Sequence, residues 1–225
     1  MRVPSYAGSS SLDPAVQSTI LAAVSPPAKL TPKGAATRAR IVETAAALVL
    51  ERGVGGTSLD DIRSATRTSK GQLFHYFPGG KVELVHALAA LQYERVLAAQ
   101  RPWIDRLDGW DAWERWRDAL LAHYGSQPRW GCPIGALAAE LAGRDPQRAV
   151  DVAARMDDWC AHLRRGGERM RANGLLRVDA DADALALAIF AALHGGLLLM
   201  QQQQSLAPLR AALDGALTTL RAAAA

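Results

Sequence analysis

Helical periodicity runs through nearly all of the sequence after residue 36. From Thr37, expected to cap the first helix, apolar residues recur on one helical face at Ile41, Ala45 and Leu48. No sustained two-residue alternation occurs, and no Asn-Gly or Asp-Gly turn lies between β-branched runs. The sequence therefore predicts an all-α fold. The predicted helices cover residues 37–52, 58–65, 69–77, 81–100, 108–126, 132–142, 146–172, 181–204 and 206–221.

The composition predicts folded domains rather than disorder. Of 225 residues, 49% are hydrophobic and 21% are charged, which is enough to bury a core. Residues 1–33 are rich in Ser, Pro and Ala and are expected to be a flexible tail, residues 34–80 a small domain, and residues 81–225 a larger helical domain. Two cysteines exclude a disulfide framework and, without a secretory signal, favour the reducing cytoplasm.

The most apolar segment runs from Ala184 to Met200 and contains no charged residue. A membrane-spanning helix needs about twenty apolar residues, with basic residues on its cytoplasmic flank. This segment is shorter, contains His194, and is flanked by aspartates and glutamines. We expect a helix buried in a bundle or a subunit interface, and no membrane association.

The positive charge is concentrated in one short segment. Residues 29–81 hold nine basic and four acidic side chains, for a net charge of +5. The preceding residues are neutral overall, and residues 82–225 have a net charge of −1. A basic segment of this size suits binding to a polyanion such as DNA.

Residues 58–77, SLDDIRSATRTSKGQLFHYF, have the pattern of a helix-turn-helix unit. Apolar residues, including Leu59, Ile62 and Leu73, are placed where the two helices touch, and polar residues occupy the exposed side of the second helix. First-turn N–H groups at Ser69 to Gly71 are candidates to bind a phosphate. The pattern predicts that residues 34–80 form a DNA-binding domain that recognises double-stranded DNA. Its candidate contact residues are Thr37, Ser58, Arg67, Thr68, Ser69, Lys70, Gly71, Gln72, Phe74, His75, Tyr76 and Lys81.

Between Thr37 and Leu84 the sequence contains three characteristic stretches: TRARIVETAAALVLERGVGGTSLDDI, TSKGQLFHYF and PGGKVEL. Together they resemble the DNA-binding domain of TetR/AcrR-type transcriptional regulators. The double glycine before Lys81 and the later GCPIGALAAEL resemble the LmrA/YxaF-like branch of that family. The resemblance implies that the third helix enters the major groove, and that Lys81 grips the DNA backbone. It also implies a dimer that reads two half-sites about 34 Å, or a multiple of that, apart.

The sequence departs from the family pattern at two positions of the unit. Phe74 replaces the usual tyrosine that contacts a phosphate, and Tyr76 is a candidate to replace it. Arg67 replaces the usual glycine of the turn. Either the turn avoids a left-handed residue here, or Arg67 adopts that conformation at a cost of roughly 1–2 kcal/mol.

The larger domain carries all six tryptophans. Helical spacing places five side chains on one stripe: Trp113, Trp116, Leu120, His123 and Tyr124. Two interpretations are open: an ordinary hydrophobic core, or an aromatic-lined cavity for a hydrophobic effector. The resemblance implies an effector in this domain, and the branch indicates aromatic or phenolic compounds. The candidate effector-binding residues are Trp113, Trp116, Leu120, His123, Trp130, Cys132, Trp159, His162 and His194.

Two long predicted helices, 146–172 and 181–204, are the expected dimer contacts. Gly195 and Gly196 would let a neighbouring helix approach closely, and two helices from each subunit would form a four-helix bundle.

Catalytic motifs are absent from the sequence: there is no phosphate loop, GxSxG or HExxH. Cys160 and His162 would face different directions on a helix, which makes a poor metal pair. We expect no enzyme activity, no cofactor and no metal ion, and a homodimeric, ligand-responsive regulator. The resemblance alone implies that the regulator is a repressor, which its effector releases from an operator. The competing hypothesis is an all-α small-molecule carrier or enzyme with a vestigial DNA-binding unit.

Overall fold

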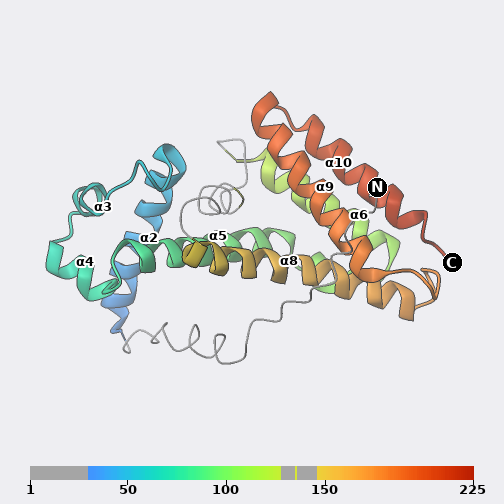
Figure 1. Cartoon of the computed structure of the whole chain (residues 1–225), viewed down its shortest axis with the longest axis horizontal. Helices are drawn as coiled ribbons and strands as arrows, with labels where there is room; N and C mark the ends of the chain where they lie inside the picture. The colour runs from blue at the N-terminus through green and yellow to red at the C-terminus, as the bar shows by residue number, and fades with distance from the viewer. Residues whose placement is uncertain (1–29, 128–134, 136–145) are drawn as a thin grey trace, which may run out of the picture. The chain divides into compact units, whose positions relative to one another are not determined.

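The computed structural model describes residues 30–127, 135 and 146–225. These residues form helices and no strand; the only β-type pairing among them is an isolated bridge between Leu176 and Ala224. The helices, labelled in Figure 1, are α2 (Pro32–Arg52), α3 (Leu59–Thr66), α4 (Lys70–Tyr76), α5 (Lys81–Gln100), the 3-10 helix η1 (Trp103–Arg106), α6 (Trp110–Gly125), α8 (Pro146–Ala172), α9 (Ala182–Gln203) and α10 (Ala207–Arg221). The all-α prediction is confirmed.

The chain divides into two compact units, residues 1–38 and 39–225. In the first unit, α2 begins at Pro32 rather than at the predicted cap Thr37. The hydroxyl of Thr31 accepts a hydrogen bond from the Gly34 N–H at 3.2 Å, and Pro32 suits the first helical position because it has no N–H to leave unpaired. Thr37 lies inside the helix, where its hydroxyl donates to the Lys33 carbonyl. The prediction that Thr37 caps the helix is therefore wrong.

The second unit contains two hydrophobic clusters. The smaller one gathers buried side chains of α2, α3, α4 and the start of α5, with Ile41, Ala45 and Phe77 fully buried. The larger one gathers α5, η1, α6, α8, α9 and α10. The predicted boundary between domains at residue 80 stays a prediction, because α5 contributes to both clusters.

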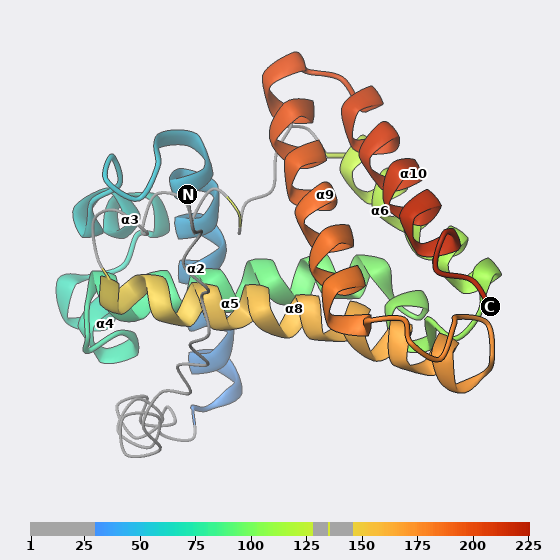
Figure 2. The ribbon, with the colours of Figure 1, turned by 45° about the vertical axis from the view of Figure 1, so that its right-hand side comes forward.

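Helix α5 supplies one helical face to each cluster. Leu84 and Leu88 belong to the smaller cluster, whereas Val85, Ala89 and Tyr93 belong to the larger one. Pairs such as Leu84 and Val85 are adjacent in the chain and therefore point about 100° apart around the helix. In Figure 2, α5 runs alongside α8, away from α3 and α4.

A buried polar group lies at the centre of the larger cluster. The side-chain oxygen of Gln100, the last residue of α5, accepts hydrogen bonds from the indole N–H of Trp116 at 2.8 Å and of Trp159 at 3.1 Å. Its amide nitrogen donates to the Val96 carbonyl at 2.8 Å. One fully buried glutamine thus satisfies indole groups from α6 and α8 and joins these helices to α5.

Helices α9 and α10 pack side by side in both ribbon views (Figures 1 and 2). Gly196 lies at their contact, where an added Cβ would come within 2.8 Å of Ala212. Gly195, its neighbour, faces open space. α9 is long and apolar enough to cross a bilayer by length and composition alone. One face of α9 is buried against α10 and α8, and the rest of the helix is not buried.

Replacing Gln100 with leucine tests this buried network. The substitution leaves two buried indole N–H groups without an acceptor, and each unsatisfied group costs about 1–3 kcal/mol. We expect Gln100→Leu to lower the free energy of unfolding by at least 2 kcal/mol in urea titrations at a fixed protein concentration. Gln92→Leu, at a half-buried position of the same helix, is the control. A Gln100→Leu protein as stable as this control would contradict the role of the network.

Candidate functional site

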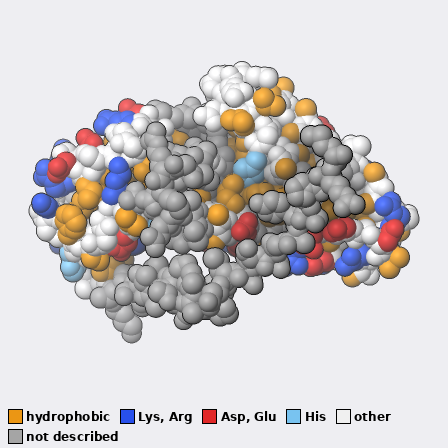
Figure 3. Space-filling view, viewed as in Figure 1, with side chains coloured by type: hydrophobic (Ala, Val, Ile, Leu, Met, Phe, Trp, Pro, Cys, Tyr) orange, Lys and Arg blue, Asp and Glu red, His pale blue; other side chains and the backbone are white. Residues whose placement is uncertain are grey.

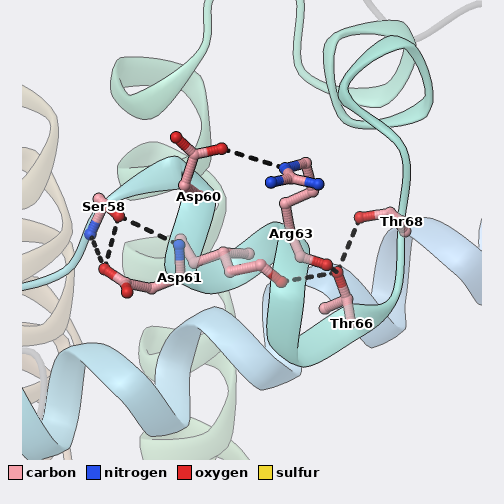
Figure 4. Close-up of polar contacts among 7 residues, drawn as sticks. Ser58, Asp60, Asp61, Arg63, Thr66 and Thr68 are labelled. Atoms are coloured by element: carbon pink, nitrogen blue, oxygen red, sulfur yellow. Dashed lines mark hydrogen bonds and ion pairs between the residues drawn. The ribbon is translucent and has the colours of Figure 1, made fainter.

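Helix α3 is held at its N-terminus by a reciprocal capping box (Figure 4). The Ser58 hydroxyl accepts from the Asp61 N–H at 3.1 Å, while the Asp61 carboxylate accepts from the Ser58 N–H at 2.8 Å and from the Ser58 hydroxyl. These hydrogen bonds from Ser58 lower the pKa of Asp61. The Ser58 hydroxyl therefore serves the cap, and its predicted DNA contact stays a prediction.

The turn between α3 and α4 passes through a left-handed residue. Arg67 adopts φ 53° and ψ 38°, so the second of the two sequence alternatives is the one observed. The Thr68 N–H donates to the Arg63 carbonyl, which closes the end of α3. The Arg67 side chain is exposed and free to extend outward.

Thr68 turns inward instead. It is 5% exposed, and its hydroxyl lies 2.8 Å from the hydroxyl of Thr66, which in turn donates to the Ile62 carbonyl (Figure 4). The Arg40 guanidinium also donates to the Thr66 carbonyl. Thr68 thus holds the turn to the end of α3 through Thr66 and presents little surface to a ligand. Its DNA contact stays a prediction.

A second capping box opens helix α4. The Ser69 hydroxyl accepts from the Gln72 N–H at 3.1 Å, and the Gln72 side-chain oxygen accepts from the Ser69 N–H at 3.1 Å. The Ser69 N–H, predicted as a phosphate donor, is therefore already used. Gln72 was predicted only as a reader of bases; sequence reasoning missed its capping role, although the spacing Ser-x-x-Gln is the signal for it.

The two sides of α4 differ sharply in burial. Leu73 and, just beyond the helix, Phe77 are buried against α2 and α5. The opposite side is open to solvent and carries Lys70, Gly71, Gln72, Phe74 and His75. Phe74 is 41% exposed although it is a large apolar residue, and Tyr76 is half-buried with its ring edge-on to His75.

The start of α5 follows directly. Gly80 precedes it with φ 61°, a conformation that disfavours any side chain, and an added Cβ there would lie 3.6 Å from the Phe74 ring. Lys81 is the first residue of α5 and is half-buried.

Lys and Arg side chains gather over the part of the surface formed by α3 and α4, with some Asp and Glu among them (Figure 3). Thr37 belongs to the first unit and is half-buried in α2.

In the larger cluster, the predicted aromatic stripe is core. Trp113, Trp116, Leu120 and Trp159 are each at most 1% exposed. The rings of Trp113 and Trp116 pack edge-on at 5.6 Å. Of the two interpretations, an ordinary core describes these four side chains. Trp130 and Cys132 lie outside the described residues.

The three predicted histidines are half-buried and sit in different places. Burial lowers the pKa of His123, His162 and His194. His162 lies 3.7 Å from Asp105, and His123 lines a cleft beside α2 and α5. His194 packs against Trp159 and Phe190, and its Nδ1 lies 3.0 Å from the Phe190 carbonyl. The structure does not bring the three together.

Two profiles of known families match the chain. The profile "Bacterial regulatory proteins, tetR family" matches residues 41–88, and the profile for the C-terminal domain of LmrA/YxaF-like transcriptional regulators matches residues 111–215. The regulator Rv0196 of Mycobacterium tuberculosis, described as an HTH-type transcriptional regulator, is 31% identical over 178 residues, which cover 76% of this chain and 88% of that protein. The chain belongs to the TetR family of bacterial transcriptional regulators.

Two further relatives, one of them a TetR regulator by name, support this assignment. A regulator from Chloroflexus aurantiacus has a solved structure with a TM-score of 0.74 at 30% identity, covering 86% of this chain and 98% of that one. The HTH-type transcriptional repressor DhaR of a Mycobacterium species is 25% identical over 76% of this chain and 86% of its own length. These relatives are regulators, so the predicted absence of enzyme activity is confirmed and the competing carrier or enzyme hypothesis is not supported.

Sequence reasoning missed two groups in this TetR-family chain. One is Gln100, whose polar side chain gave no sign of being buried. The other joins α5 to α8, where the Tyr93 hydroxyl donates to Asp158 and Arg155 lies over the Tyr93 ring. Burial and this hydrogen bond raise the pKa of Tyr93. Among the described residues, no cluster of His, Cys, Asp and Glu is suited to a metal ion.

The second capping box yields a paired prediction. Glutamate at position 72 keeps an oxygen for the Ser69 N–H and adds a charge that suits a helix N-terminus, whereas alanine removes the acceptor. We expect Gln72→Glu to keep the free energy of unfolding of the wild-type protein and Gln72→Ala to lower it by about 1 kcal/mol. Urea unfolding followed by circular dichroism measures both values. Equal stability of the two variants would contradict the cap.

Proposed function

We propose that this TetR-family regulator is a ligand-responsive repressor that acts in the cytoplasm as a homodimer on an operator in double-stranded DNA. The observation that carries the proposal is the exposed side of α4. Its polar and basic side chains face solvent, while Leu73 and Phe77 anchor the helix in the core. A short helix held in this way can enter a major groove without losing its packing.

The exposed side chains of α4 match the chemistry of a major groove. Lys70 can donate to the O6 and N7 atoms of guanine, and the exposed Phe74 ring suits the methyl group of thymine. Gln72 keeps its amide N–H groups for a base edge while its oxygen holds the cap. Lys81 and Arg67 flank α4 in the chain, and their cationic side chains suit phosphates.

The support for a homodimer is an outward apolar face. On α9, Leu187, Leu198 and Leu199 are 63%, 56% and 45% exposed, and Gly195 lies beside them with open space around it. Gly215 of α10 also meets nothing within 4 Å. This face favours α9 and α10 as the two helices contributed by each subunit, rather than the expected pair 146–172 and 181–204. A contiguous apolar patch of this kind is costly to leave in water.

Repression and ligand response rest on two further observations. DhaR, a relative, is named a transcriptional repressor. Helix α5 packs in both hydrophobic clusters, so a ligand that shifts it within the larger cluster would also move its first turn, where Lys81 lies. Such a shift would change the spacing of the two α4 helices in a dimer and weaken binding to paired half-sites. The two cysteines of the chain suit a reducing cytoplasm.

The DNA contacts are tested with fluorescence anisotropy on the DNA upstream of the gene for this protein. Lys70→Ala should weaken the binding free energy for that DNA by about 1–3 kcal/mol and reduce the protein's preference for it over an unrelated duplex. Lys81→Ala should weaken binding to both DNAs and lower the salt dependence of binding by the equivalent of about one phosphate contact. Gln72→Glu retains the helix cap but should weaken binding to both DNAs, because it places a negative charge beside the phosphates. Unchanged preference in Lys70→Ala would contradict base reading by α4.

The dimer is tested by light scattering after gel filtration. The wild-type protein should have twice the chain mass of 24.0 kDa, and Leu198→Arg should have the mass of one chain because it places a charge in an apolar interface. Val178→Arg is the matched control, since Val178 is 91% exposed outside α9 and α10. A wild-type monomer, or dissociation of both variants alike, would contradict the proposed interface.

A further inference from the structure

A cleft of about 570 Å³ lies where α2, α5 and the end of α6 meet. Helix α2 contributes Glu43 and Leu50, α5 contributes Arg95 and Val96, and α6 contributes His123. The volume is typical of a site for a small organic molecule. Trp113, Trp116 and Trp159, the predicted effector-site tryptophans among the described residues, do not line this cleft.

The polar chemistry of the cleft centres on one ion pair. A single nitrogen of Arg95, Nη2, donates to both carboxylate oxygens of Glu43, at 2.5 and 2.6 Å. Both side chains are about half exposed, so water reaches the pair and it contributes little stability by itself. The guanidinium has five N–H donors in a planar fork, so a carboxylate that engages two of its nitrogens at once can outcompete Glu43, which is held by one nitrogen.

The remaining walls of the cleft are mostly apolar. Ala46, Ala47 and Leu50 form the α2 side, and Leu50 is 45% exposed although it is a large hydrophobic residue. Val96 and Ala98 form the α5 side. Burial lowers the pKa of His123, so its imidazole is neutral at pH 7 and adds no charge to the cleft. The site therefore offers one cationic group, its carboxylate partner, neutral polar side chains such as Gln92 and Gln127, and apolar walls.

We propose that this cleft binds a small organic carboxylate with an apolar body, and that its carboxylate competes with Glu43 for Arg95. This assignment rests on the proposed function, because it gives the ligand-responsive regulator its effector site. The apolar body of the ligand lies against the exposed side chains of Ala47 and Leu50, where it buries surface that water now contacts.

Binding in this cleft acts on the joint between α2 and α5. Glu43 and Arg95 are an ion pair that directly links these two helices. The same helix α2 supplies Ile41 and Ala45 to the core that supports α3 and α4. A ligand that replaces Glu43 on Arg95 removes this link and wedges the helices apart. The ligand then favours a state in which α4 is displaced from its DNA-bound position.

The test uses three probes with the same aromatic body and different charges: naphthalene-1-carboxylate, the neutral naphthalene-1-carboxamide and cationic 1-naphthylmethylammonium. Calorimetry on the full-length protein without DNA measures their affinities. We expect the acid to bind roughly tenfold more tightly than the amide, because a charge-assisted pair with Arg95 is added. Fluorescence anisotropy on the upstream DNA should show at least about fivefold weaker DNA binding with the acid present.

Two variants assign the effect to the cleft. Arg95→Gln should abolish the preference for the acid over the amide, and Ala47→Phe, which fills the cleft, should weaken both. The control is Arg221→Gln, which breaks a similarly exposed ion pair between α10 and Glu114 of α6 and should keep the preference. Thermal unfolding of each variant verifies that it is folded.

The outcomes distinguish failure of the proposed ligand site from failure of the proposed function. The assignment is overturned if the wild-type protein fails to bind the acid, if it prefers the amide or the amine, or if Arg95→Gln keeps the preference. If the acid binds as expected but DNA binding does not change, the coupling between α2 and α5 is wrong. Failure of the ligand-free protein to bind its upstream DNA would contradict the proposed function, while the calorimetric result would still decide the site.

Discussion

The packing of α5 in two hydrophobic clusters is the constraint on which the rest of the structure depends. Leu84 and Leu88 complete the small core beneath α3 and α4, while Val85, Ala89 and Tyr93 enter the core of the larger part. Because interiors are close-packed, a rigid helix shared by two cores cannot shift in one without disturbing the other. Gln100 holds the far end of the same helix through two indole groups.

The helix-turn-helix unit shows how polar residues can be divided between structure and recognition. Ser58, Thr68 and Ser69 use their hydroxyls for hydrogen bonds within the chain, in two exposed capping boxes and a buried turn. This internal bonding fixes α4 and leaves Lys70, Phe74 and His75 to face outward. A short helix has little intrinsic stability, so its caps and its two buried aromatic and aliphatic anchors decide whether it keeps its position.

Much of this arrangement could be predicted from local sequence signals. Lys81–Gln100 and Pro146–Ala172 begin and end where glycine, proline and helical spacing predict. Thr37 was misassigned because Thr31 and Pro32 form an equally good helix start six residues earlier. The conformation of Arg67 and the burial of Thr68 depend on tertiary contacts, which local propensity does not contain. For the same reason, periodicity placed the tryptophans on one stripe but could not distinguish a packed core from a cavity, or reveal the Glu43–Arg95 cleft.

The family relationship and the exposed side of α4 support a regulator that binds two half-sites on double-stranded DNA. Hydroxyl-radical footprinting of the DNA upstream of its own gene tests this reading directly. The predicted result is two protected half-sites with related, inverted sequences, their centres separated by a whole number of turns of about 10–10.5 base pairs. Uniform protection along the duplex, or no protection at concentrations where the protein is dimeric, would contradict it.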